Sequence, residues 1–250
     1  MEFVPRLFDP PAGDYFLFGP RGTGKSTWLR RVYEDALWLD LLSPDVERRL
    51  KARPERLREM VAGAGEGRVV VVDEVQRVPE LLTVVHQLIE ERPGVRFVLT
   101  GSSARKLKRT GIDLLAGRAV VRHLHPFLAG ELGRDFDLDR ALRQGLLPVV
   151  WDAEDPEDTL SAYAGLYVRE EVQAEALVRD LGGFQRFLEA VSFSQASVLN
   201  LAEVARECQV HRKTVEGFLG VLEDLLLAFR LPVFTKRARR KVTAHPKLYF

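Results

Sequence analysis

The sequence has one cysteine, no long apolar run and almost no net charge, and each of these excludes a class of protein. Its 250 residues include one cysteine, Cys208, which excludes an internal disulfide and favours a reducing compartment. No run approaches the roughly 20 apolar residues that a transmembrane helix needs. The formal net charge is +1, so no overall field directs the chain to nucleic acid or to a membrane. We therefore expect a cytoplasmic protein with no membrane partner.

Hydrophobic residues are abundant in the chain, and basic residues are concentrated near its end. Hydrophobic residues make up 46% of the chain, enough to build the core of one large domain or of two smaller ones. Basic residues are unevenly distributed, because the segment from Arg230 to Phe250 contains seven Lys or Arg and no Asp or Glu. This local excess of positive charge is a candidate contact for a polyanion.

A phosphate-binding loop is the most specific motif in the sequence. The pattern G-x-x-x-x-G-K-[ST] is matched at every fixed position, after the apolar run Tyr15–Phe18 and before a segment with helical character. Glycines allow successive backbone N–H groups to face phosphate oxygens, and the following helix adds its positive end. Lys25 is expected to reach the β- and γ-phosphates. The predicted nucleotide-binding residues are Gly19, Pro20, Arg21, Gly22, Thr23, Gly24, Lys25, Ser26 and Thr27.

A second motif, an acidic strand end, strengthens the first. Four consecutive valines precede Asp73 and Glu74, which is typical of a strand covered on both faces. The Ser26 hydroxyl is expected to ligate Mg²⁺ directly, and Asp73 to help position the ion. Glu74 lies where a carboxylate polarises the attacking water, so its presence favours hydrolysis over simple nucleotide storage.

Strand-like and helix-like segments alternate in the first half of the chain, which predicts a parallel α/β sheet with right-handed crossovers. The expected strands are 15–18, 36–39, 68–73 and 95–100, and the expected helices are 26–33, 44–50, 54–61 and 81–92. The predicted fold class is α/β, a P-loop NTPase sheet with a helical lid, followed by an α-helical winged-helix domain. The expected boundaries are 1–127 for the ATPase domain, 128–190 for the lid, 191–235 for the winged helix and 236–250 for a basic tail.

Two polar positions beyond the strands are candidates for a role at the γ-phosphate. Ser102 follows the strand that ends at Thr100, where a hydroxyl senses the γ-phosphate or caps the next helix. Arg118 follows a glycine just past the expected sheet, and it is either an arginine finger, in cis or across a subunit interface, or a surface ion pair. Arg105 and Arg21 are weaker candidates for the same role.

Two histidines, His123 and His125, flank Leu124 with the spacing of one strand face. No cysteine or acidic cluster accompanies them, so packing against the last strand of the sheet is favoured over a metal site.

The segment from Leu199 to Leu219 has helix-turn-helix spacing. Its apolar positions line one face of each helix, so Cys208 is interpreted as a buried hydrophobe. Contact with double-stranded DNA is one prediction for this domain, and packing that transmits the motion of the ATPase is the alternative. The basic residues predicted to contact DNA are Arg212, Lys213, Lys236, Arg237, Arg239 and Arg240.

Together these strings resemble the prokaryotic AAA-type ATPases that join a phosphate-loop domain to a winged helix and a C-terminal domain of unknown function. The resemblance is carried by Phe18–Thr27, Val72–Pro79, Leu99–Ser103 and Leu115–Arg118. It implies ATP binding and hydrolysis, for which Ser26 and Asp73 predict Mg²⁺ as the second cofactor, and an arginine finger across a subunit interface predicts a homo-oligomer. It also makes His245–Phe250 the first strand of the C-terminal domain, so we expect a shortened chain.

Three functions follow as hypotheses. The first is an ATP-hydrolysing switch coupled to DNA through the winged helix. The second is an ATPase that regulates a protein partner without DNA contact, and the third is a nucleotide-binding module with negligible turnover.

Overall fold

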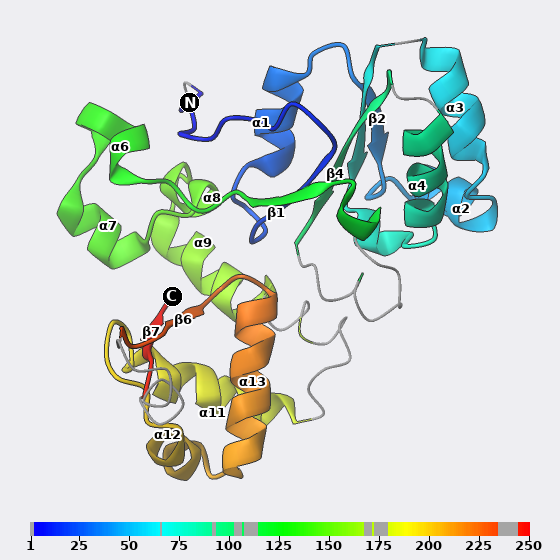
Figure 1. Cartoon of the computed structure of the whole chain (residues 1–250). Helices are drawn as coiled ribbons and strands as arrows, with labels where there is room; N and C mark the ends of the chain where they lie inside the picture. Colours follow the sequence, from blue (N-terminus) through cyan, green and yellow to red (C-terminus); the bar gives the residue numbers. More distant parts are fainter. Residues whose placement is uncertain are drawn as a thin grey trace. The chain divides into compact units, whose positions relative to one another are not determined.

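The computed structural model of the chain describes residues 3–65, 67–91, 94–102, 107, 115–167, 172, 180–234 and 245–250. The chain divides between Leu160 and Ser161 into two compact units. Both units are drawn in Figure 1.

The first unit contains a five-stranded parallel sheet with the order β2-β3-β4-β1-β5. Its strands are β1 (Tyr15–Phe18), β2 (Leu37–Asp40), β3 (Val69–Asp73), β4 (Arg96–Gly101) and β5 (Val120–His123). The predicted α/β parallel sheet is confirmed. Because all the strands run in one direction, their carboxyl ends meet at one edge, where open α/β sheets bind ligands.

Helices cover both faces of this sheet, with α1 on one side and α2, α3 and α4 on the other (Figure 1). Apolar stripes at helical spacing account for these elements, and Leu81, Leu82, Val85 and Leu88 of α4 are buried. The bounds are α1 (Lys25–Val32), α2 (Pro44–Ala52), α3 (Arg56–Ala64), the short 3₁₀ turn η1 (Val75–Arg77) and α4 (Leu81–Glu91).

The core of the sheet lies in β1, β3 and β4. Every residue of β1 is fully buried, as are Val70, Val71 and Val72 of β3. Burial on both faces explains why these strands are continuous apolar runs rather than alternating ones.

The edge strand β5 required a correction. We expected Leu124–Phe127 to pack the last strand and the two histidines to share a strand face, but β5 ends at His123. The backbone N–H of Leu124 donates to the Phe18 carbonyl at 2.8 Å, and Pro126 then removes a donor. His125 is therefore outside the strand. Val120 and Val121 are exposed, so this strand lacks the apolar signal of the buried ones.

The 3₁₀ turn η2 (Leu115–Gly117) precedes β5. Short helices follow β5: α6 (Ala129–Leu132), η3 (Gly133–Asp135), α7 (Leu138–Gln144), α8 (Pro148–Trp151) and α9 (Pro156–Ala162). Phe127, Leu132 and Trp151 form a small buried cluster among them. The boundary at 160/161 divides the segment 128–190 that we expected to act as one lid.

The described residues of the second unit form three main helices and two short antiparallel strands. Its elements are the π-helical turn η4 (Tyr163–Tyr167), α11 (Leu181–Ser192), α12 (Leu201–Cys208), α13 (Arg212–Asp224), β6 (Phe229–Leu231) and β7 (Lys247–Tyr249). The Asn200 side chain caps α12 by accepting from the N–H groups of Ala202 and Glu203. Gln209 ends α12 in the left-handed conformation, with φ of 57°, where glycine is usual.

A single apolar core holds this unit together. Phe184, Phe187 and Phe218 pack with ring centroids 5.2–5.8 Å apart. Cys208 is fully buried in the same core, as predicted, and desolvation raises the pKa of its thiol. A buried neutral thiol packs as a small hydrophobe and is a poor nucleophile.

The position of β7 corrects a second expectation. We expected His245–Phe250 to be the first strand of a further domain, with an apolar end that is exposed unless it pairs; β7 pairs antiparallel with β6. Leu248 is fully buried in the helical core, and the Tyr249 and Phe229 rings stack at 5.3 Å. This pairing joins segments about 16 residues apart, and no local pattern could have revealed it.

Among the residues described, no helix is long and apolar enough to cross a membrane.

Replacement of Leu248 by Ala tests whether β7 belongs to the second unit. Loss of a fully buried leucine from a packed core costs about 2–5 kcal/mol of unfolding free energy. All three tryptophans lie before residue 160, so far-UV circular dichroism or hydrogen exchange in α13 peptides is the suitable probe. Phe250→Ala, at a side chain that is 48% exposed, is the matched control, and we expect a change of at most about 0.5 kcal/mol. Equal small changes in both variants would show that β7 does not dock.

Candidate active site

The phosphate-binding loop connects β1 to α1. Its glycines are required by the backbone conformation and by the close approach of neighbouring atoms. Gly22 and Gly24 each have φ of 81°, in the left-handed region. A Cβ added to Gly19 would lie 2.3 Å from the Leu124 carbonyl oxygen, and one added to Gly22 would lie 2.5 Å from a Val149 methyl group. The loop is therefore packed against the segment that follows β5 and against α8.

Side chains inside the loop bond to its own carbonyl groups. The Lys25 ammonium donates to the carbonyls of Gly19 at 2.7 Å and Pro20 at 3.0 Å, and the lysine is only 5% exposed. The fully buried Thr23 hydroxyl donates to the Pro20 carbonyl at 2.9 Å. These contacts hold the ammonium against the first residues of the loop.

The acidic strand end meets the loop through Asp73. One carboxylate oxygen of Asp73 accepts from the Ser26 hydroxyl at 2.7 Å, and the other accepts from the Thr100 hydroxyl. Asp73 and Thr100 are both buried. A serine hydroxyl beside a carboxylate is a pair of hard oxygen donors, the kind of ligand that Mg²⁺ prefers. The residues predicted to hold the ion are thus in direct contact.

Glu74 leaves β3 in the left-handed conformation, with φ of 61°. Its backbone N–H donates to the Thr100 hydroxyl oxygen at 3.0 Å, so Thr100 fixes both acidic residues. The Glu74 side chain is only partly buried and accepts from the Gln76 amide. A non-glycine residue in this region of backbone space is costly unless its surroundings hold it, and such residues cluster at functional sites.

Thr100 and Gln76 are the site residues that sequence reasoning missed. We expected the polar end of β4 to act through Ser102, whose hydroxyl lies 3.3 Å from the Gln76 amide nitrogen. Ser102 therefore belongs to the same polar cluster. The available signals were a threonine at a strand end and a glutamine two residues after Glu74, but neither identifies a contact by itself.

Arg6 anchors the outer side of the loop. Its guanidinium donates to the Thr23 carbonyl at 2.8 Å and to the Pro126 carbonyl at 3.2 Å, and it also contacts the His125 carbonyl. It pairs with Glu131 at 3.1 Å, and the two side chains are 5% and 3% exposed. Arg6 thus ties the N-terminal segment, the phosphate loop and the start of α6 together.

A cavity of about 230 Å³ adjoins the loop in the first unit. Its walls are mainly apolar, with Asp152 as a carboxylate whose pKa is raised by desolvation. The lining residues include Phe3, Val4, Thr27, Trp28, Phe127 and Asp152. Thr27 and the loop residues Thr23 and Gly24 form part of its wall.

Arg118 lies near the amino ends of the strands, whereas the phosphate loop lies at their carboxyl ends. Val120, two residues later, pairs with Tyr15 at the start of β1, whereas the phosphate loop follows the end of that strand. The Arg118 guanidinium contacts the Glu90 carboxylate of α4. The expected surface ion pair is therefore present, and a role toward the nucleotide of its own chain is incompatible with this position.

The remaining predicted positions are distributed as follows. Arg21 and Thr27 are exposed at the loop and at the start of α1. His123 ends β5, and desolvation, followed by the neighbouring His125, lowers its pKa. Ser103 and Arg105 lie outside the described residues. Within the described ranges, no group of three or more His, Cys, Asp or Glu could hold a metal ion.

Family models match almost the whole chain. Residues 14–133 match the model of an AAA domain, which contains the phosphate loop, β3 and β4. This part of the chain is therefore an AAA domain of the P-loop type. Residues 135–250 match a domain of unknown function, DUF8612, so the AAA domain is followed by a second matched region.

Two curated relatives align with most of the chain. They are uncharacterized proteins of Mycobacterium bovis and Mycobacterium tuberculosis, each 27% identical over 240 residues, which is 93% of this chain. The alignment covers 53% of each relative, so the chain spans about half the length of the curated relatives it matches.

Solved structures show weaker similarity. A variant of RuvB from Thermotoga maritima is 14% identical with a TM-score of 0.38, over 92% of this chain and 87% of that one. The ORC2 protein of Aeropyrum pernix in its ADP form is 16% identical with a TM-score of 0.40, over 87% and 81%. Scores of this size do not establish a shared arrangement of the whole chain.

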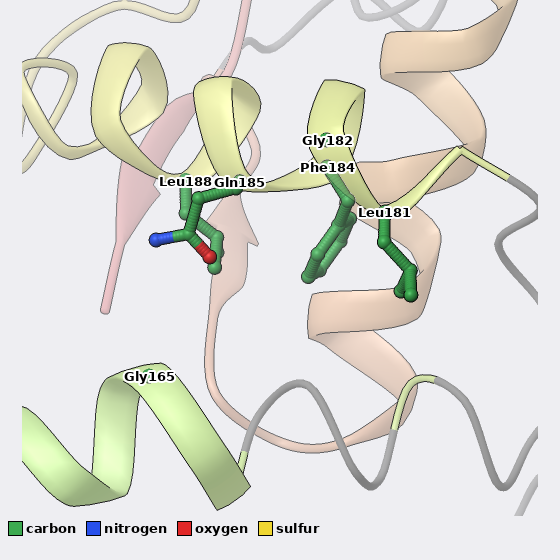
Figure 2. A pocket seen from close by; sticks show the side chains of 6 residues that line it. All are labelled: Gly165, Leu181, Gly182, Phe184, Gln185 and Leu188. Carbon is green, nitrogen blue, oxygen red and sulfur yellow. The ribbon is translucent and has the colours of Figure 1, made fainter.

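The second unit has its own cavity, of about 470 Å³, beside α11. Figure 2 shows the Leu181 and Phe184 side chains on this helix, with the backbone of Gly165 in the helical turn facing it. The residues that line this cavity are Gly165, Leu181, Gly182, Phe184, Gln185 and Leu188. None of these carries a charge, so the cavity has no cation for a phosphate group.

The basic residues predicted to contact DNA are described only in part. Arg212 and Lys213 are exposed in the first turn of α13, and Arg212 pairs with Glu216 at 3.2 Å. Lys236, Arg237, Arg239 and Arg240 lie outside the described residues.

Replacement of Glu131 by Gln tests the anchor on the phosphate loop. The change leaves the buried Arg6 guanidinium without its counter-charge, which costs about 3–5 kcal/mol when one partner of a buried pair is removed. Tryptophan fluorescence during urea unfolding reports on the first unit, because Trp28, Trp38 and Trp151 all lie there. Asp45→Asn is the control, since the Asp45–Arg48 pair is 81% and 76% exposed and should contribute at most about 1 kcal/mol. Equal losses in both variants would contradict a structural role for Arg6.

Proposed function

We propose that the chain binds ATP with Mg²⁺ and hydrolyses it. The observation that carries this proposal is the contact of Ser26 with Asp73 directly beside Lys25 and Glu74, at the carboxyl edge of the parallel sheet. The match to an AAA domain supports ATP as the nucleotide. The sequence itself contains no motif that selects adenine.

Nucleotide binding is assigned to the loop and to the adjoining cavity. The backbone N–H groups from Gly22 to Lys25 face the phosphates, and the Lys25 ammonium exchanges its carbonyl partners for β- and γ-phosphate oxygens. Thr27 lies near the α-phosphate. The base occupies the cavity of about 230 Å³, where Trp28 offers an apolar wall and Asp152 an acceptor for an exocyclic amino group.

Hydrolysis is assigned to the polar cluster at the ends of β3 and β4. Ser26 and Asp73 would hold Mg²⁺, which would supply neutralisation of the charge on the β- and γ-phosphates. The Glu74 carboxylate orients a water molecule toward the γ-phosphorus and accepts its proton. The Ser102 hydroxyl contacts the γ-phosphate or that water.

Arg118 is proposed to act in trans. It lies at the edge of the sheet opposite its own phosphate loop, so it can complete only the site of a second copy of the chain. To do so its guanidinium must leave Glu90, an exposed partner that holds it weakly. This assignment requires a homo-oligomer.

Coupling to double-stranded DNA is proposed for the second unit. Three helices followed by an antiparallel strand pair are the elements of a winged helix, and Arg212 and Lys213 are exposed at the start of α13. Basic side chains at this position neutralise DNA phosphates, and the sequence-distant Lys236, Arg237, Arg239 and Arg240 would add to them.

Two substitutions separate nucleotide binding from turnover. Lys25→Ala should abolish ATP binding, measured by calorimetry, because the loop loses the buried ammonium assigned to the β- and γ-phosphates. Glu74→Gln should bind ATP as the parent does and lose at least about 100-fold in turnover, because the base is removed. Glu80→Gln, an exposed carboxylate before α4, is the control and should change neither value. Equal loss of binding in both site variants would contradict the assigned roles.

The salt dependence of DNA binding tests the second unit. Each phosphate contact contributes about 0.9 to the slope of log K against log salt, so the double variant Arg212→Ala, Lys213→Ala should lower the slope by about 2. Basal ATP hydrolysis should remain unchanged. Arg48→Ala, in the first unit, is the control. If the parent chain binds no duplex at 50 mM salt, regulation of a protein partner replaces DNA contact as the proposed coupling.

A further inference from the structure

Gln76 is a buried amide next to the proposed catalytic carboxylate, and the mechanism above assigns it no role. It lies in η1, two residues after Glu74, and is 8% exposed. Its amide nitrogen donates to one Glu74 carboxylate oxygen and lies 3.3 Å from the Ser102 hydroxyl oxygen. One side chain thus contacts both of the groups that we assign to the water and the γ-phosphate.

The local structure is built around this amide. A Cβ added to Gly101 would lie 2.6 Å from the Gln76 carbonyl oxygen, so only glycine leaves room for the side chain at the end of β4. That oxygen is fully buried and has no hydrogen-bond partner in the part of the chain that the structure describes. An unpartnered buried carbonyl costs free energy. Such a cost is tolerated where the other end of the group performs a function.

The two contacts of Glu74 fix different parts of it. Thr100 holds the backbone N–H at 3.0 Å, and Gln76 holds one carboxylate oxygen. Glu74 itself is partly exposed, whereas both of its partners are buried. The carboxylate is therefore held at one oxygen, while the side chain as a whole stays partly accessible.

We propose that Gln76 is a positioning residue. Its amide fixes the Glu74 carboxylate and the Ser102 hydroxyl relative to each other, so that the attacking water and the γ-phosphate are held in a defined orientation. This inference rests on the proposed ATPase function. A water molecule attacks the γ-phosphorus, the bond to the bridging oxygen of ADP breaks, and the water proton passes to Glu74. Gln76 changes no bond in this step and acts only through orientation, for which misplacement by about 1 Å can cost about 100-fold in rate.

The first test is Gln76→Leu, which keeps the approximate size of the side chain and removes its amide. We expect kcat for ATP to fall by about 10- to 100-fold and KM to change by less than about twofold, because the phosphate loop is untouched. Gln87→Leu is the matched control, since this glutamine of α4 is exposed and its carbonyl oxygen accepts from Arg58. A purely structural role would lower the urea midpoint of the tryptophan signal and raise KM.

The second test, Gln76→Glu, gives a pH signature. A protonated carboxyl at this position can still donate to Glu74, whereas an ionised one cannot and repels it. The ratio of variant to parent kcat should therefore be highest at low pH and fall as the pH rises. A structural defect would leave this ratio independent of pH.

The outcomes separate the inference from the function on which it rests. If the parent hydrolyses ATP and Gln76→Leu turns over equally fast or faster, the positioning role is wrong and the ATPase remains. If the parent binds no ATP or shows no Mg²⁺-dependent hydrolysis, the proposed function fails and the role of Gln76 fails with it. Reduced kcat with an unchanged KM, together with the pH-dependent ratio, supports the role.

Discussion

The hydrogen bonds of the Asp73 carboxylate are the interaction on which the rest of the site depends. Ser26 donates from the start of α1 at 2.7 Å, and Thr100 donates from β4. Because Asp73 is itself the last residue of β3, three segments that are distant in sequence are joined at one buried acid. Thr100 in turn accepts from the backbone of Glu74, so the conformation of the proposed base follows from the same contact. Loss of Asp73 would therefore affect the proposed metal site and the proposed base together.

A second constraint acts on the outer side of the phosphate loop. Its carbonyl groups are held by the Arg6 guanidinium at Thr23 and by the Val149 N–H at Gly22, at 2.8 Å and 3.2 Å. Carbonyls that are bonded outward leave the N–H groups of the loop directed inward, as phosphate binding requires. Sequence reasoning found the loop but not these supports, because Arg6 and Val149 are brought to it only by the tertiary fold. The same holds for Gln76, whose contact with Ser102 crosses from η1 to the end of β4.

The sequence was most informative where strands are buried on both faces. The apolar runs of β1, β3 and β4 predicted the parallel sheet, and the phosphate loop and acidic strand end predicted which edge of it carries the site. Prediction failed at β5, whose exposed valines give no continuous apolar signal, and at β7, which pairs with a strand about 16 residues earlier. Arg118 illustrates a further limit, since its ion pair with Glu90 follows from the direction of β5 rather than from any motif.

Phosphate release from ATP by the purified chain, measured across protein concentration with Mg²⁺ and with excess chelator, tests the central claim most directly. The account predicts hydrolysis that needs Mg²⁺ and rises more than linearly with protein, because Arg118 must come from a second copy. Addition of duplex DNA should raise it further if the second unit couples to DNA. If ATP binds but no phosphate is released under any of these conditions, the proposed hydrolysis is wrong and the chain is a nucleotide-binding module.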